Sequence, residues 1–367
     1  MVDPSVSSRN DAVQATDAFS VAGQTQAAHD ALPMRRVDPQ AKLVQMLVNP
    51  CAGSSSKKLL ADEITSALAE AGYEVQRLGS PDELRDASHE VTSSGSLRCV
   101  VGLGGDGTLG AMLNMTPPGV PLAIVPQGTE NLMAGYLRMT RRASDLVRLI
   151  EEGQVIDLDA GVANGRLFSL MASVGFDADV VRRVHERRLA SGGGNISHLA
   201  YAQPILEAMG GYEFPQVRIT PLDADGRDLE PVEGTWVFAV NLPRYASGLR
   251  IVPWADGVDG QLDLCVFQRG QTHAGLWYLW HVLRGRHQML ESVVTRRVRS
   301  CRIEAVDGAE APYQIDGDPG GFLPLELGVA PGRMALLATR STAARLASEW
   351  RLANADRRGV ERSSQAS

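Results

Sequence analysis

A glycine-rich segment, Cys99–Met115 (CVVGLGGDGTLGAMLNM), constrains the fold of this chain more than any other feature. A short apolar run predicts a buried strand, four glycines follow within six residues, and Leu109, Met112 and Leu113 then recur at the spacing of one helix face. A strand, a tight loop and a helix start let the backbone approach a phosphate closely, and helical N–H groups favour an anion there. Asp106 is the unexpected member, because a carboxylate repels a phosphate unless a cation or a reacting proton lies between them. We therefore interpret Asp106 as a chemical residue and not as a packing residue.

Strands and helices alternate on both sides of this segment. The apolar patterns predict strands at 43–48, 73–78 and 121–126 and helices at 59–71 and 81–92. Such alternation is typical of parallel βαβ units, whose loops gather at the carboxyl ends of the strands. Polar loops at 49–58, 104–108 and 127–131 are therefore expected to meet at one edge of a sheet. Ordinary turn chemistry would explain one such loop more easily than three, so we favour a phosphate site.

The pattern changes after about residue 155, where short strand-like runs dominate and predict antiparallel β structure. The expected strands are 167–174, 216–220, 235–241, 261–268, 298–304, 313–316 and 334–339, with helices at about 177–190, 197–210 and 273–284. The predicted fold is thus an N-terminal Rossmann-like α/β nucleotide domain followed by an antiparallel β-sandwich. The expected divisions are a disordered lead (1–40), the α/β domain (41–160), the sandwich (161–340) and a C-terminal helix and tail (341–367) that returns to the first domain.

Composition excludes several classes of protein. The net charge of −7 argues against a nucleic-acid-binding protein, which normally carries a basic surplus. The four cysteines show no CxxC spacing, so we expect free thiols in a reducing compartment and no structural zinc. The N-terminus lacks the apolar core of a signal peptide, and no run of about 18 apolar residues occurs. We expect a cytoplasmic protein whose contact with a membrane, if any, is peripheral.

Two nucleotide-binding motifs need to be weighed against the glycine-rich segment. Gly102–Gly107 formally satisfies GxGxxG, but that motif expects an acidic residue after the next strand, where Pro126 and Gln127 stand. Asp106 would also face the pyrophosphate, and two like charges about 4 Å apart repel by roughly 1 kcal/mol even in water. The P-loop pattern GxxxxGK[ST] does not occur in the chain. Neither motif therefore explains the segment.

Six short motifs occur in an order that resembles the diacylglycerol kinase catalytic-domain family, which also includes sphingosine and ceramide kinases and bacterial lipid kinases. They are Asn49–Gly53 (NPCAG), Gly104–Thr108 (GGDGT), Pro126–Asn131 (PQGTEN), Ser173–Ala178 (SVGFDA), Asp259–Asp263 (DGQLD) and Asp316–Asp318 (DGD). The resemblance spans residues 43–339, whereas GGDGT alone is shared with NAD kinases. It implies an α/β nucleotide domain and a β-sandwich, with ATP and a lipid hydroxyl meeting in the cleft between them.

The resemblance also implies which residues contact ATP. They are Asn49, Cys51, Ala52, Gly53, Ser54, Gly104, Gly105, Asp106, Gly107, Thr108, Gly128 and Thr129, with Asn131 supporting its loop and Ser80 added at the end of the second strand. Lys57 and Lys58 either neutralise phosphate or are simply solvated at a helix start.

Two carboxylates are the catalytic candidates. The family carries its general base in a DGE motif, and Asp318 occupies that place here, one methylene shorter than glutamate. The shorter side chain requires the cleft to close slightly further or a water to bridge. Asp106 is expected to hold Mg²⁺ or to orient the acceptor hydroxyl. Taken alone, residues 316–320 would be interpreted as a hairpin turn, since Asp-Gly favours one.

A second, structural Mg²⁺ site is implied near the start of a sandwich strand. The resemblance gives Asp259 as the carboxylate ligand, assisted by backbone carbonyls near Asp256 and Gln261. Such oxygen ligands suit Mg²⁺, although a solvated Asp/Gly loop is the alternative.

The function that these residues imply is an ATP- and Mg²⁺-dependent lipid kinase of phospholipid biosynthesis that converts diacylglycerol to phosphatidic acid. A sphingosine, ceramide or other glycerolipid acceptor stays open. An NAD kinase is disfavoured by PQGTEN and DGD, and a catalytically silent regulator is kept open by Asp318 and Ala52. A lipid substrate implies peripheral membrane contact, and a homodimer stays open. The aromatic helix at 276–283 (LWYLWHVL) either packs on the sandwich or contacts a membrane interface.

Overall fold

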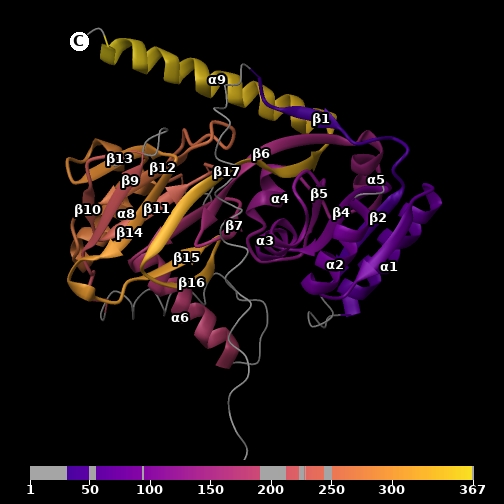
Figure 1. Ribbon diagram of the computed structural model, residues 1–367, viewed down its shortest axis with the longest axis horizontal. Helices are drawn as coiled ribbons and strands as arrows, with labels where there is room; N and C mark the ends of the chain where they lie inside the picture. The colour runs from indigo at the N-terminus through magenta and orange to yellow at the C-terminus, as the bar shows by residue number, and fades with distance from the viewer. Residues whose placement is uncertain are drawn as a thin grey trace, which may run out of the picture.

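The computed structural model describes residues 31–48, 55–92, 95–190, 212–222, 227, 229–243 and 250–365. It has two lobes that lie side by side (Figure 1). The expected helix at 197–210 and the loop residues 49–54 lie outside the described residues.

The first lobe is the predicted parallel α/β domain. Its elements are β2 (Leu43–Val48), α1 (Ser55–Glu70), β3 (Glu74–Leu78), α2 (Pro81–Thr92), β4 (Leu97–Gly104), α3 (Asp106–Met115), β5 (Leu122–Pro126), α4 (Leu132–Tyr136) and α5 (Ala143–Glu152). The strands pair in the parallel order β5-β4-β2-β3. Strand β4 is buried from its second residue to its last, as its apolar sequence requires of a central strand covered on both faces. The α/β part of the fold prediction is confirmed.

The second lobe is the predicted β-sandwich. Its elements are β6 (Gln154–Ala163), β7 (Arg166–Phe168), β8 (Met171–Val174), α6 (Phe176–Ala190), β9 (Val217–Leu222), β10 (Val232–Gly234), β11 (Trp236–Val240), β12 (Leu262–Phe267), α8 (Thr272–Leu283), η3 (His287–Met289), β13 (Val293–Val298), β14 (Ser300–Ala305), η4 (Val306–Gly308), β15 (Pro312–Ile315), β16 (Asp318–Phe322) and β17 (Leu325–Ala338). One antiparallel sheet runs β13-β12-β11-β8-β15-β16. Val237 and Leu264 from this sheet share a buried cluster with Ile219 and Ile303 from the other sheet, which is the core expected of a sandwich.

The second sheet of the sandwich is continuous with the sheet of the first lobe. It runs β10-β9-β14-β17-β5-β4-β2-β3, because β17 pairs antiparallel with β14 in its first half and parallel with β5 at Leu336. Strand β6 follows β17 along the other side. We had assigned the strand at 334–339 to the second domain only, but its apolar residues Met334–Ala338 are buried beside β5 and extend the parallel sheet.

The start of the described chain also differs from expectation. We predicted disorder up to residue 40, yet Met34–Arg36 (β1) pairs antiparallel with Gln154–Ile156 of β6. Arg35 Nε lies 2.9 Å from Asp157 Oδ2, so an ion pair accompanies the backbone pairing. Backbone hydrogen bonds to the edge of β6 hold the polar segment Met34–Arg36 in a strand conformation.

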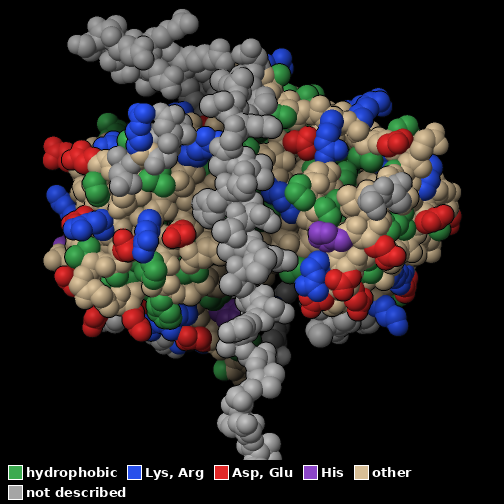
Figure 2. All heavy atoms as spheres, viewed as in Figure 1, with side chains coloured by type: hydrophobic (Ala, Val, Ile, Leu, Met, Phe, Trp, Pro, Cys, Tyr) green, Lys and Arg blue, Asp and Glu red, His purple; other side chains and the backbone are tan. Residues whose placement is uncertain are grey.

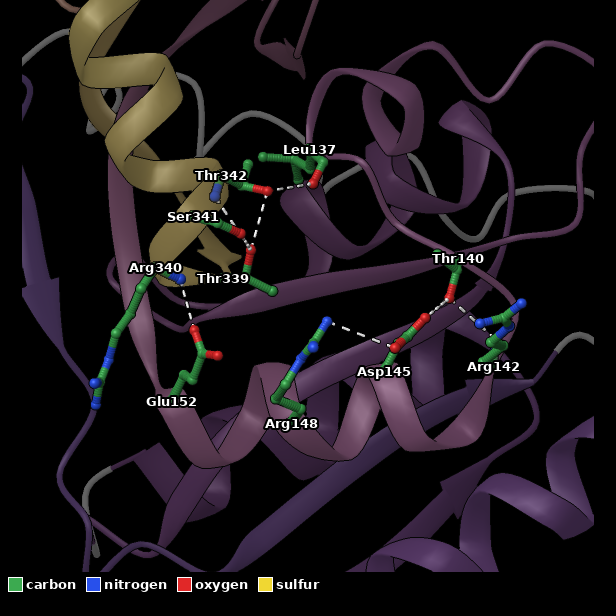
Figure 3. A network of polar contacts seen from close by, with 10 residues as sticks. All are labelled: Leu137, Thr140, Arg142, Asp145, Arg148, Glu152, Thr339, Arg340, Ser341 and Thr342. Carbon is green, nitrogen blue, oxygen red and sulfur yellow. Dashed lines mark hydrogen bonds and ion pairs between the residues drawn. The ribbon is translucent and has the colours of Figure 1, made fainter.

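The C-terminal helix α9 (Arg340–Gln365) begins against the first lobe and extends over the second (Figures 1 and 3). Thr339 caps it, since its Oγ1 accepts a hydrogen bond from the backbone N–H of Thr342 at 3.2 Å. The Arg340 N–H donates to Glu152 Oε2 at 2.6 Å, and the buried Thr342 hydroxyl donates to the carbonyl of Leu137 at 3.2 Å. These contacts join the end of β17 to α5 and α4.

Two surface properties bear on partners. Among the described residues, no helix combines the length and apolar character needed to cross a membrane. Figure 2 shows Lys and Arg side chains interspersed with Asp and Glu side chains over both lobes on the face viewed.

Candidate active site

The glycine loop between β4 and α3 forms the floor of the site. A Cβ at Gly104 would overlap the side chain of Thr108, so only glycine fits at the end of β4. Gly105 stands at the N-cap of α3 and supplies no side-chain cap. The amino end of α3 therefore has backbone N–H groups for an anion, and the residues present fit a nucleotide phosphate.

The loop after β5 touches the glycine loop. A Cβ at Gly128 would lie 2.8 Å from the Cα of Gly105, so a side chain at Gly128 would force the two loops apart. Asn131 closes this loop, because its Oδ1 accepts from the Gly128 N–H and its Nδ2 donates to the Gly128 carbonyl, both at 2.7 Å. Asn131 has a φ of 51°, a left-handed conformation that asparagine tolerates better than most residues. Two of the three polar loops thus meet at one edge of the sheet.

Asp106 joins these two loops. Its Oδ2 accepts a hydrogen bond from the Leu132 N–H and its Oδ1 from the Met133 N–H, both at 2.9 Å. The carboxylate thereby caps α4 from a distance. Burial raises the pKa of Asp106, and the two backbone hydrogen bonds oppose that rise. Asp106 therefore has a structural role that we did not predict, as the acceptor of two backbone hydrogen bonds. Its chemical role, a contact with Mg²⁺ or with an acceptor hydroxyl, stays a prediction.

Asp318 reaches the glycine loop from the second lobe. A methyl group placed on Gly107 would lie 3.4 Å from Asp318 Oδ2, although the two residues are far apart in the sequence. Arg166 Nη2 lies 3.5 Å from the same oxygen, and the Asp318 side chain is 47% exposed. The structure thus places an accessible carboxylate beside the predicted phosphate loop.

The hydrogen bonds of Asp316 fix the turn that carries Asp318. Asp316 Oδ2 accepts from the N–H and the hydroxyl of Ser169 at 2.7 and 2.9 Å, and Oδ1 accepts from the N–H groups of Leu170 and Met171 at 2.8 and 3.0 Å. Burial raises the pKa of Asp316, and these hydrogen bonds oppose the rise. Residues 316 and 317 form the two-residue turn of the β15–β16 hairpin, as Asp-Gly favours, and the four hydrogen bonds of Asp316 hold this turn in one orientation.

The loop predicted to hold a structural Mg²⁺ lies at the same end of the six-stranded sheet as this turn, because Asp263 pairs with Val240 and the strands continue across the sheet in register. Gln261 N–H donates to Asp259 Oδ1 at 3.0 Å, and Asp256 Oδ1 accepts from Trp350 Nε1 of α9 at 3.0 Å. Within the described ranges, no group of three or more His, Cys, Asp or Glu residues could hold a metal. A Mg²⁺ site formed by the Asp259 carboxylate and backbone carbonyls stays a prediction.

Ser80, predicted to contact ATP, is used at the start of α2. Its hydroxyl accepts from the Glu83 N–H at 3.2 Å, and Glu83 Oε2 accepts from the Gly79 N–H at 2.7 Å. The sequence SPDE shows this capping-box spacing, which was the signal that we missed.

The remaining predicted contacts are only partly described. Asn49, Cys51, Ala52, Gly53 and Ser54 lie outside the described residues, as does the side chain of Lys57. Lys58 is exposed on α1. Their role in nucleotide binding stays a prediction.

Sequence reasoning missed three polar residues around the site. The buried Asp159 accepts from the Gly260 N–H at 2.7 Å and from the Gly332 N–H at 2.8 Å, which fastens the 256–261 loop to β17. Asn241 Nδ2 donates to the carbonyls of Asp159 and Ser169, both at 2.8 Å. β6 contains two carboxylates, and the one in its centre, between Leu158 and Ala160, was a signal for Asp159, whereas nothing in the sequence pointed to Arg166.

Family comparisons match the two lobes separately. Residues 44–163 match the model of the diacylglycerol kinase catalytic domain, and residues 171–338 match the model of the YegS C-terminal NAD kinase beta sandwich-like domain.

Known proteins resemble the chain over most of its length. It is 27% identical to a diacylglycerol kinase of Mycobacterium tuberculosis (strain CDC 1551 / Oshkosh) over 311 residues, which are 81% of this chain and 95% of that protein. It is 28% identical over 283 residues to the "Probable lipid kinase YegS-like" of Pseudomonas aeruginosa (strain UCBPP-PA14), covering 74% of this chain and 88% of that protein. The crystal structure of a diacylglycerol kinase from Bacillus anthracis (strain Sterne) has the same fold, with a TM-score of 0.59 at 20% identity, covering 82% of this chain and 98% of that one.

Proposed function

Because the chain belongs to the diacylglycerol kinase catalytic-domain family and is a lipid kinase, we propose that it transfers the γ-phosphate of ATP to the hydroxyl of diacylglycerol. The observation that carries this proposal is the position of Asp318, whose carboxylate lies against Gly107 of the glycine loop. A general base and a phosphate-binding loop must meet for a hydroxyl to attack a phosphate.

The chain's own groups suit each part of such a transfer. The amino end of α3 and the tight backbone at Gly105 and Gly128 would hold the phosphates of ATP. Asp318 would take the proton of the lipid hydroxyl as its oxygen bonds to the γ-phosphorus. The bond from that phosphorus to the bridging oxygen breaks, leaving ADP and phosphatidic acid. Mg²⁺ bound to the phosphates would supply neutralising charge.

Arg166 supports the assignment of Asp318 as the base. Its guanidinium is 3.5 Å from Asp318 Oδ2, so it can orient a carboxylate that is shorter than the glutamate of the family. Asp316 limits the movement of the same turn through four hydrogen bonds. The Asp318 side chain is shorter than glutamate, but the turn that carries it has a fixed orientation toward the glycine loop.

The acceptor is tested by transfer of labelled phosphate from ATP to diacylglycerol, sphingosine, ceramide and NAD. We expect label in phosphatidic acid and a loss of about 10²- to 10⁴-fold in Asp318→Asn, the usual contribution of a general base. Asp318→Glu, which restores the family residue, is the matched control and should keep measurable transfer. Label in phosphorylated NAD, or ATP binding without transfer to any acceptor, would contradict the proposal.

A diacylglycerol acceptor also requires contact with a bilayer, since this lipid resides there. We therefore include peripheral membrane association and a cytoplasmic location in the proposal. The docking surface is a separate question.

A further inference from the structure

Helix α8 is apolar on two opposite faces. From Thr272 to Leu283 it contains no Asp, Glu, Lys or Arg. A helix that is hydrophobic all round is normally enclosed by protein or faces a membrane. Only half of α8 is enclosed by the described chain.

The inner face of α8 packs on the six-stranded sheet. Ala274, Tyr278 and Val282 are buried, and the Tyr278 ring centroid lies 4.7 Å from that of Phe267 on β12. The Tyr278 hydroxyl is 3.0 Å from Ser292 Oγ and accepts from the Arg269 N–H at 3.1 Å. These contacts fix the rotation of the helix.

The outer face presents large apolar side chains to solvent. It consists of Leu276, Trp277, Leu279, Trp280 and Leu283, joined by Met289 of the neighbouring turn η3; we call these six residues the α8 patch. Trp277 is 52% exposed, Trp280 45% and Leu283 65%. The two indoles stack with centroids 5.7 Å apart and planes at 17°. Exposed apolar patches of this kind are typical of sites that bind protein or membrane.

Cationic side chains border the patch. The Arg284 guanidinium lies 4.2 Å from the centroid of the Trp280 ring, and Arg286 and Arg269 are also exposed. No Asp or Glu occurs between residues 269 and 290, although the whole chain carries a net charge of −7. The local charge is therefore opposite in sign to that of the chain.

We infer that the α8 patch docks the protein on a bilayer that contains anionic lipid. Tryptophan rings prefer the headgroup level, leucine side chains enter the acyl boundary, and arginines attract anionic headgroups. A twofold contact with a second copy would be less complementary, because residues 269–290 contain three arginines and no carboxylate, and Glu291 is the single acidic residue that follows directly. This inference rests on the proposed function, because a lipid acceptor is the reason to expect contact with a membrane. Its test is vesicle binding, which does not require phosphate transfer.

The patch is separate from the catalytic carboxylate. Helix α8 packs on β12, whereas Asp318 begins β16 at the far edge of the sheet, four strand spacings away. At about 4.8 Å per strand this is roughly 20 Å. Changes in the patch should therefore leave the chemistry intact.

Co-sedimentation with vesicles tests the inference on the full chain. We expect binding to phosphatidylcholine vesicles that contain phosphatidylglycerol, and at least a tenfold loss in Leu283→Glu and in the double variant Trp277→Ser/Trp280→Ser. Arg284→Gln and Arg286→Gln should each weaken binding about fivefold, and only when phosphatidylglycerol is present. Leu352→Glu is the matched control, since Leu352 on α9 is 67% exposed and lies outside the patch.

Three results would overturn the inference. They are unchanged vesicle binding in the patch variants, an equal loss in Leu352→Glu, and a change from dimer to monomer in Leu283→Glu by light scattering, which would make the patch a contact between copies. Phosphate transfer to a water-dispersed short-chain diacylglycerol is measured in parallel and should be the same in all these variants. Absence of transfer in the wild type would contradict the proposed function, while the vesicle result would still decide the docking surface.

Discussion

Replacing Asp106 by asparagine should destabilise the protein, because both carboxylate oxygens accept partly buried backbone hydrogen bonds. Asparagine keeps one acceptor oxygen and turns an NH₂ group toward the other N–H of α4. One charge-assisted hydrogen bond is lost and one N–H is left unsatisfied, which costs about 2 to 3 kcal/mol. For a chain of 367 residues the melting temperature should fall by roughly 3 to 4 °C.

Asp318→Asn is the matched comparison for this variant. The Asp318 side chain is 47% exposed and its ion pair with Arg166 is 3.5 Å long, so its removal should change the free energy of unfolding by less than about 1 kcal/mol. The two variants should therefore differ in which property they lose, stability or phosphate transfer. Asp106→Asn should lose stability, whereas Asp318→Asn should lose phosphate transfer without a comparable loss of stability.

The assay is urea denaturation of the two variants and the wild type at pH 7, followed by circular dichroism, with phosphate transfer measured well below each midpoint. If Asp106→Asn keeps wild-type stability to within about 0.5 kcal/mol and still loses transfer, the capping role assigned to Asp106 is refuted. A purely chemical role would then account for the residue.

The remaining predictions concern the loops and the pH response. Gly128→Ala should abolish nucleotide protection in a thermal-shift assay and cost about 1 to 3 kcal/mol, because its Cβ would lie 2.8 Å from the Cα of Gly105; full protection would show that the loops can separate. Asn131→Ala should lower stability by about 1 to 3 kcal/mol through two lost hydrogen bonds, and unchanged urea midpoints would contradict this. Asp316→Ala should lower both kcat and the melting temperature, since four donors lose their acceptor; normal kcat in a folded variant would separate that turn from catalysis. Burial raises the folded-state pKa of Asp106 above 3.8, so the folded state binds this proton more readily than the unfolded chain does. The free energy of unfolding of the wild type, relative to that of Asp106→Asn, should therefore rise as the pH falls through the raised pKa toward 3.8. A stability difference that shrinks over this range would reverse the assigned sign.

The convergence of the first-lobe loops was predictable because βα alternation dictates where strands end. Parallel strands with intervening helices place their carboxyl ends at one edge, which is why the loops at 104–108 and 127–131 were expected to meet. The meeting of Gly107 with Asp318 depended on the resemblance to a family, since periodicity does not specify how two lobes face each other. The partners of Asp106 could not be predicted, because a carboxylate in a loop gives no indication of which distant N–H groups it will accept.

Other differences arose where a sequence pattern is correct but incomplete. The apolar residues Met334–Ala338 predict a strand, yet they do not say that β5 is its neighbour. The pattern of α8 predicts burial, but it cannot tell which half of an apolar helix the protein itself covers. Local signals specify elements, whereas long-range pairing decides the exposed faces.

The shared strand pair β6 and β17 has a mechanical consequence. Their register shifts between Ala330 and Met334 at the junction of the lobes, and the Asp159 carboxylate holds Gly332 there at 2.8 Å. Leu113 of the first lobe and Phe238 of the second belong to one buried cluster. Any movement of one lobe against the other must therefore bend this double strand, because no free linker joins the lobes at β6 and β17. The two lobes should unfold together and resist being produced as separate fragments.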